Sequence, residues 1–128
     1  MKYLLDVNVL VAALWTGHVH HDPVHRWIDH MTESDTAMTC GLTEAGYLRV
    51  IHAAYGVPVA EARSVLKDFK QRAGLGYLLE LPSPVEVLPA WARSHKQVTD
   101  AYLAGVAAQA GAKLVTLDRG IPGAKLLT

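Results

Sequence analysis

Residues 3–15 read YLLDVNVLVAALW, an apolar stretch that is interrupted by one acidic residue. The apolar run at 3–5 is typical of a short buried strand, which we expect to end at Asp6. Residues 8–15 continue as a helix-like segment, and Gly17 is a suitable place for that helix to stop. A strand that leads directly into a helix is a characteristic unit of α/β folds.

The rest of the chain repeats this alternation of strands and helices. We expect strands at 37–40 and 113–117, and a further one at either 77–81 or 85–88. Helices are expected over 23–31, with Asp22 as the cap, from a Thr43 cap to Gly56, from 58 to Gly74, and over about 91–110. The pattern predicts one domain, residues 1–128, built as a three-layer α/β/α sandwich around a mainly parallel sheet.

Composition narrows the possible classes of protein. Apolar residues make up 51% of the 128 and charged residues 19%, which is typical of a globular domain. Twelve basic and twelve acidic residues give a net charge of zero. Any nucleic-acid partner must therefore be bound by a local group of basic residues or by a metal ion. The single cysteine, Cys40, excludes an intrachain disulfide. Asp6 and Asn8 interrupt the hydrophobic region of any signal peptide, and no run reaches the roughly 20 apolar residues of a membrane span, so we expect a cytoplasmic protein with no membrane partner.

Four acidic residues interrupt or abut apolar segments: Asp6, Glu44, Asp100 and Asp118. The first and last of them follow expected strands, and the other two fall in the first turns of expected helices. Ligands of open α/β sheets bind beyond the carboxyl ends of the strands, and helix starts open on that same edge. The topology therefore allows all four carboxylates to converge.

Several carboxylates without cysteine ligands suit hard cations such as Mg²⁺ or Mn²⁺. Such an ion activates water for attack on a phosphodiester and stabilises charge on the phosphoryl oxygens. Each acid also has a purely structural interpretation. Asp6 and Asp118 could be turn residues, Glu44 part of a helix cap, and Asp100 an ordinary first-turn acid.

Three segments of the chain resemble the motifs of PIN-domain proteins, and specifically of the VapC toxins of bacterial toxin–antitoxin pairs. They read LLDVNVLVAAL, LTEAGYLRVI and VTDAYLAGVAAQAGAKLVTLDRGI. The resemblance covers nearly the whole chain, and its specificity lies in the combination of the first motif with TDAYL and LVTLD.

The resemblance implies a Mg²⁺- or Mn²⁺-dependent endoribonuclease that is inhibited by a cognate VapB-type antitoxin and is usually a homodimer. Asp6, Glu44, Asp100 and Asp118 match the family's metal-binding catalytic acids, and Asn8 and Thr116 match polar residues that we expect to orient the carboxylates. Some relatives carry a further acid shortly after the last aspartate. Here Arg119 and Gly120 follow instead, which favours one tightly held ion, with a second recruited along with RNA.

Basic, histidine and aromatic side chains supply further candidates. Arg49, Lys96 and Arg119 are the basic residues nearest to the motif acids, and they are candidate contacts for substrate phosphate. Five of the seven histidines lie within residues 18–30, where His21 and His25 have a spacing that transition metals exploit, although a surface helix and loop is the favoured interpretation. The large aromatic residues favour a core role by default and a dimer or antitoxin surface as the alternative. They are Trp15, Trp27, Tyr47, Tyr55 and Trp91.

Three other interpretations remain open on the sequence. The first is a housekeeping RNA-processing nuclease of the same fold without an antitoxin. The second is a receiver-like signalling domain, which is disfavoured because Asp35 precedes the second expected strand instead of ending it. The third is a non-catalytic RNA- or protein-binding module, against which the presence of all four acids argues.

Overall fold

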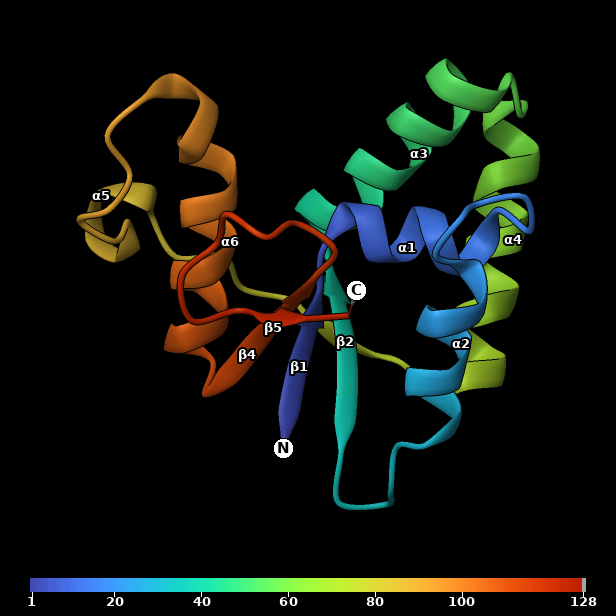
Figure 1. The fold of residues 1–128 in the computed structure, drawn as a ribbon, viewed down its shortest axis with the longest axis horizontal. Coiled ribbons are helices and arrows are strands. Elements are labelled where there is room, and N and C mark those ends of the chain that lie inside the picture. The colour runs from blue at the N-terminus through green and yellow to red at the C-terminus, as the bar shows by residue number, and fades with distance from the viewer. Residues whose placement is uncertain (128) are drawn as a thin grey trace.

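A five-stranded parallel sheet forms the centre of the molecule (Figure 1). The structure, a computed structural model, describes residues 1–127. The strand order is β3-β2-β1-β4-β5. The strands are β1 (Lys2–Leu5), β2 (Thr36–Cys40), β3 (Gly76–Leu78), β4 (Ala112–Thr116) and β5 (Lys125–Leu126). The predicted parallel sheet is confirmed, and β5 is a short edge strand that the sequence did not reveal.

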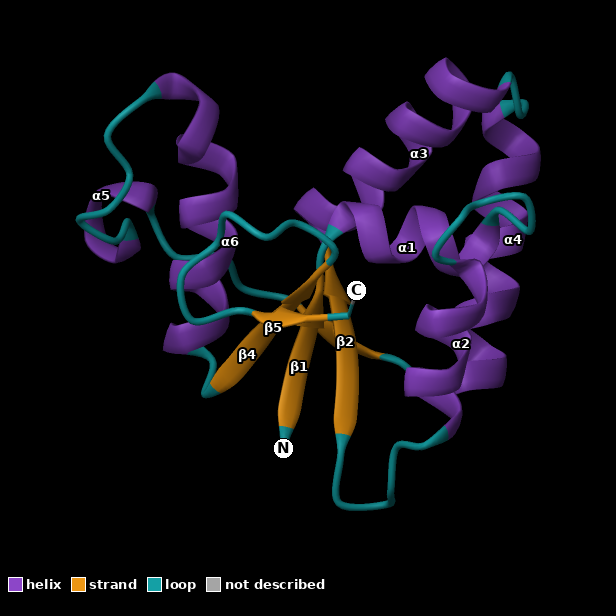
Figure 2. Cartoon of the chain, in the orientation of Figure 1, coloured by secondary structure: helices purple, strands orange, loops and turns teal. Residues whose placement is uncertain are grey.

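Helices cover both faces of this sheet (Figure 2). The four helices that come first in the chain, α1 to α4, lie on one side of the sheet, and α5 and α6 lie on the other side. The predicted three-layer α/β/α sandwich is therefore confirmed. The helices are α1 (Val7–Leu14), α2 (His21–Asp29), α3 (Gly41–Tyr55), α4 (Val59–Ala73), α5 (Pro84–Val87) and α6 (Val98–Gln109), with a short 3₁₀ turn, η1 (His95–Gln97), before α6.

Alternate residues of the central strands feed two separate cores. Leu5 and Val115 pack with α1 to α4, whereas Leu4 and Leu114 pack with α6. All four side chains are at most 2% exposed, because neighbouring residues of a strand point to opposite faces and here both faces are covered. This explains why the central strands are continuously apolar instead of alternating.

Several predicted boundaries shift in the structure. Residues 85–87 belong to the short helix α5, which ends before Leu88, and not to a strand, because Ser83 caps a helix that has Pro84 in its first turn. Thr43 does not cap α3, since the helix begins at Gly41 and the Thr43 hydroxyl instead accepts a hydrogen bond from the Cys40 N–H at 3.0 Å. Asp22 lies inside the first turn of α2 and does not cap it.

The predicted helix over 91–110 is wrong in its first third. The side-chain oxygen of Gln97 accepts hydrogen bonds from the N–H groups of Arg93 and Ser94, at 2.9 and 3.2 Å, and this holds the chain in a turn. The helical hydrogen bonds of α6 therefore start only at Val98. As a result, Asp100 lies in the first turn of α6, at the same edge of the sheet as the strand ends.

No membrane-spanning helix occurs in residues 1–127, where every helix lacks the combination of length and apolarity that crossing a bilayer requires.

Gly105 fixes the distance between α5 and α6, because a Cβ atom at this position would lie 2.1 Å from the carbonyl oxygen of Val87. We predict that Gly105→Ala destabilises the protein by about 1–3 kcal/mol, although alanine favours helix more than glycine does. Urea denaturation followed by circular dichroism measures the change. Ala108→Gly, at an exposed position of the same helix, is the matched control and should lose about 1 kcal/mol through helix propensity alone. A Gly105→Ala protein more stable than the wild type would contradict this packing.

Candidate active site

Asp6 is held rigidly between β1 and α1. Its side chain caps α1, with Oδ1 accepting the Val7 N–H at 2.7 Å and Oδ2 accepting the Thr116 hydroxyl at 2.8 Å. Only 5% of the residue is exposed. Burial raises the pKa of this carboxyl above its ordinary value, and the negative charge of Asp118 adds to the increase, while the two hydrogen bonds oppose it. Asp6 is thus a buried and oriented carboxylate with little access to water.

Thr116 joins the ends of the two central strands. Its hydroxyl donates to Asp6 and accepts the N–H of Asp118 at 3.0 Å. Asn8 supports the same junction, because its side-chain oxygen accepts the Leu117 N–H at 3.1 Å and its amide group donates to the Thr116 oxygen at 3.3 Å. The structure therefore places both predicted supporting residues in one hydrogen-bonded network with Asp6.

Asp100 and Asp118 complete a group of three aspartates with Asp6. The pKa of Asp100 is raised to about 6, first by burial, then by the negative charges of Asp6 and Asp118, and finally by a hydrogen bond with Asp118. Asp118 is exposed, and its Oδ1 accepts the Gly120 N–H at 2.9 Å, which gives it the turn role as well. Burial is the largest cause of this increase, and the negative charges of Asp6 and Asp118 add to it.

Glu44 does not join the aspartates. Its Oε2 accepts the Thr39 hydroxyl at 2.5 Å and forms an ion pair with the Lys70 ammonium at 2.6 Å. The same ammonium lies 4.8 Å from the centre of the Tyr77 ring. The charge of Glu44 is therefore compensated within the protein. Lys70 and Thr39 were missed by the sequence analysis, and no signal could have found Lys70, because only tertiary packing brings α4 against the start of α3.

The donor chemistry of the three aspartates fits a hard divalent cation. All their ligand atoms are carboxylate oxygens, and a cation would relieve the repulsion that raises the pKa of Asp100. Within residues 1–127, no three or more acidic, histidine or cysteine side chains are placed so that together they could hold a metal ion. Mg²⁺ fits such a site because it usually keeps several of its waters and binds through only one or two carboxylates.

A cleft of about 380 Å³ is lined by Asp6 and Asp100 and by further residues of α1, α3 and α6. Its walls combine acidic, basic and aromatic side chains. The lining residues are Asp6, Val7, Asn8, Val11, His18, Arg49, Val50, Tyr55, Thr99, Asp100 and Leu103. Arg49 is thus the only one of the three predicted phosphate contacts in this lining. Lys96 and Arg119 are exposed and lie outside it.

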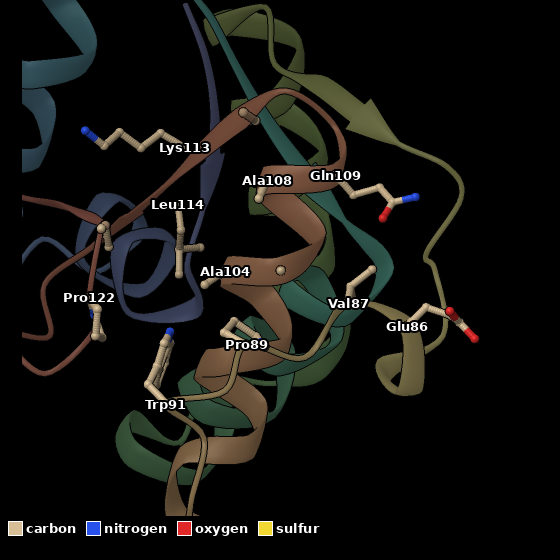
Figure 3. A pocket seen from close by; sticks show the side chains of 14 residues that line it. Glu86, Val87, Pro89, Trp91, Ala104, Ala108, Gln109, Lys113, Leu114 and Pro122 are labelled. Atoms are coloured by element: carbon tan, nitrogen blue, oxygen red, sulfur yellow. The ribbon is translucent and has the colours of Figure 1, made fainter.

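A second hollow, of about 440 Å³, is lined by residues of α5, α6 and β4 and of the loop before β5 (Figure 3). Pro89, Trp91, Ala104 and Leu114 contribute much of its apolar wall. None of the four predicted acids lines it, and its one carboxylate belongs to Glu86. It therefore has no part in the acidic site.

Two histidines of the cluster at residues 18–30, His21 and His25, have a structural role in the protein. A ring nitrogen of His21 lies 2.8 Å from the carbonyl oxygen of Ala12, and one of His25 lies 2.7 Å from that of Ala13. Because a carbonyl accepts only, each ring must place its N–H on that nitrogen. These carbonyls belong to the last turn of α1, where the helix leaves them without partners, so the two histidines cap its C-terminal end.

We predict that His25→Ala lowers the free energy of unfolding by about 1 kcal/mol or more, because it leaves the Ala13 carbonyl without its donor. Urea denaturation at pH 8 measures the loss. His30→Ala is the control, since this ring is exposed and bonds only within its own helix. Equal losses in the two variants would show that the cap contributes nothing specific.

The raised pKa of Asp100 predicts a stability effect with a definite sign. The folded protein binds this proton up to about pH 6, whereas the unfolded chain releases it near its ordinary value of 3.8. Ionisation of Asp100 therefore opposes folding above pH 6 and has no effect well below pH 4. In buffer with a chelator, Asp100→Asn should melt about 2–5 °C above the wild type at pH 8. This gain should shrink toward pH 4.5, and a gain independent of pH would contradict the assignment.

Comparison with known proteins assigns the chain to a family. The model of the PIN domain matches residues 3–125. Ribonuclease VapC38 of Mycobacterium tuberculosis is 38% identical over an alignment that covers 92% of this chain and 86% of the relative. Ribonuclease VapC29 of the same species is 36% identical, with 94% and 89% covered.

Solved structures agree on the fold. The VapBC2 complex of Rickettsia felis, bound to a promoter DNA fragment, contains a chain that superposes with a TM-score of 0.69 at 19% identity, covering 98% of this chain and 97% of that one. PAE2754 of Pyrobaculum aerophilum gives a TM-score of 0.62 at 26% identity, with 99% and 90% covered. With the family match spanning almost its full length, the chain belongs to the PIN-domain family and, within it, to the relatives named VapC ribonucleases.

Proposed function

We propose that this protein is a metal-dependent endoribonuclease that acts as the toxin of a type II toxin–antitoxin pair. The observation that carries the proposal is the group of three aspartates at the carboxyl edge of the sheet, in which Asp6 is buried and oriented and Asp100 has a pKa near 6. Burying acids next to one another opposes folding, and binding a cation for catalysis is the function that offsets this cost. The relatives named ribonucleases support RNA as the substrate.

Asp6, Asp100 and Asp118 would hold Mg²⁺ or Mn²⁺. The bound ion supplies a water nucleophile at neutral pH and stabilises charge on the phosphoryl oxygens. The chain's own contribution is position, because the Thr116 hydroxyl and the Val7 N–H leave Asp6 one orientation. Deprotonated Asp100 is needed for binding the ion, so cation binding and proton release are coupled at this residue.

Glu44 has a different proposed role from the three aspartates. Its ion pair with Lys70 favours contact with the metal through water. A direct bond from Oε2 to the metal would require the Lys70 ammonium to move away from this oxygen. Arg49 is the strongest candidate for substrate phosphate, because it lines the cleft that contains Asp6 and Asp100. Lys96 and Arg119 would contact the RNA farther from the reacting phosphate.

Regulation by a VapB-type antitoxin follows from the same family membership. The solved relatives include toxin–antitoxin complexes, and α3 with α4 offers the surface that we assign to the antitoxin and to a homodimer partner. An enzyme with this substrate and inhibitor works in the cytoplasm. The alternative is a housekeeping RNA-processing nuclease of the same fold. A short reading frame directly upstream of the gene, encoding a protein that inhibits the nuclease, distinguishes the two.

Loss of single carboxylates tests the proposal. We predict that Asp6→Asn and Asp100→Asn each lower the rate of RNA cleavage more than about 100-fold in Mg²⁺ or Mn²⁺, since loss of a supporting residue alone costs 10–100-fold. Cleavage of a labelled RNA is followed on denaturing gels, and circular dichroism checks the fold. Asp29→Asn, which changes an exposed acid on α2, is the matched control.

Thermal melting gives a readout that is independent of activity. Millimolar Mn²⁺ should raise the melting temperature of the wild type and of Asp29→Asn, but not that of Asp100→Asn. Wild-type cleavage rates in the Asp100→Asn protein, or equal Mn²⁺ stabilisation of all three proteins, would refute the metal site.

A further inference from the structure

Tyr55, which lines the cleft together with Asp6 and Asp100, stacks on the ring of Trp15. We propose that Tyr55, supported from behind by Trp15, stacks the base of an unpaired nucleotide next to the reacting phosphate, and that Arg49 holds a phosphate of the same nucleotide. The proposal rests on the proposed ribonuclease function and names the substrate as single-stranded RNA that is gripped by one base.

The aromatic pair is stacked and partly exposed. The rings of Trp15 and Tyr55 are nearly parallel, with their centres 4.3 Å apart and an angle of 11° between their planes. Trp15 lies at the end of α1, where its backbone N–H donates to the Val11 carbonyl at 2.9 Å. Tyr55 is the last residue of α3 before the Gly56 cap. Tyr55 remains 39% exposed and lines the cleft. One face of its ring is therefore covered by Trp15, and a base has a prepared aromatic surface to stack on.

The cleft has the size and chemistry of a nucleotide site. Its volume of about 380 Å³ lies within the usual range for small ligands. Val11, Val50 and Leu103 provide an apolar wall for a base, and Asp6 and Asp100 line the same cleft. A base and its phosphate require such a combination of aromatic, apolar and charged surfaces.

Arg49 supplies the local positive charge that a neutral chain needs for binding RNA. Among residues 1–127 none of the ion pairs includes Arg49, although two aspartates line the same cleft. Its guanidinium is exposed and is therefore available for a phosphate. An acidic peptide would meet the carboxylates in this cleft, whereas a nucleotide bound together with a divalent cation meets complementary charge at both ends.

Binding of a fluorescein-labelled RNA of eight uridines tests the proposal without cleavage. Anisotropy is measured for proteins carrying Asp100→Asn in buffer with EDTA, at 50 mM salt. We expect Tyr55→Leu to weaken binding about 5- to 100-fold, because stacking on one base is lost. Tyr55→Phe, which keeps the ring, is the matched control and should bind within about twofold. Circular dichroism melting confirms that each variant is folded.

A scan with abasic RNA changes the ligand and identifies which base stacks on Tyr55. The same octamer is made with a single abasic site at each position in turn, and one position should weaken binding to the Tyr55 protein but not to Tyr55→Leu. Equal affinity of Tyr55→Leu and the parent, or abasic penalties that are the same in both, would overturn the proposal and assign the rings to a protein contact.

Wild-type protein with Mn²⁺ is assayed for RNA cleavage in parallel. Cleavage without a position-specific abasic penalty refutes only the stacking site. Absence of cleavage refutes the proposed function and the reaction that the stacking site is meant to serve.

Discussion

The hydrogen bond from the Thr116 hydroxyl to Asp6 is the contact on which the candidate site depends. It crosses from β4 to β1, residues 110 apart in sequence, and it is only possible because these strands are hydrogen-bonded neighbours in the centre of the sheet. The same oxygen receives the Asp118 N–H, so one side chain sets the position of two acids. Sheet register, and not local loop structure, determines the geometry of the site.

Charge is distributed around this contact in two opposite ways. Burial and the negative charges of Asp6 and Asp118 raise the pKa of Asp100, whereas the charge of Glu44 is balanced by Lys70. The proposed cation would therefore compensate the aspartates and not Glu44. This division gives the four motif acids two kinds of environment, although all four lie near the same edge of the sheet.

The sequence predicted the parallel sheet, because it follows from apolar runs and from strand ends, and the joint role of the three aspartates stays a prediction. Asp6 and Asp118 were predictable from the strands before them, and Asp100 from the first turn of a helix. The separation of Glu44 was not predictable, since it results from α4 packing beside α3 and carrying Lys70 into reach. The start of α6 was also missed, because the Gln97 side chain competes with the helical backbone, and apolar periodicity does not report such bonds.

Helix α1 has only eight residues, which is too short to persist alone in water, and its two ends are fastened to distant parts of the chain. Asp6, itself bonded to Thr116 of β4, accepts a hydrogen bond from the first turn of α1. His21 and His25 donate hydrogen bonds to carbonyls of its last turn. Displacing the Asp6 carboxylate thus breaks hydrogen bonds to both α1 and β4. Because these contacts join buried elements of the sheet and the helix, slow amide hydrogen exchange should extend from β1 through α1.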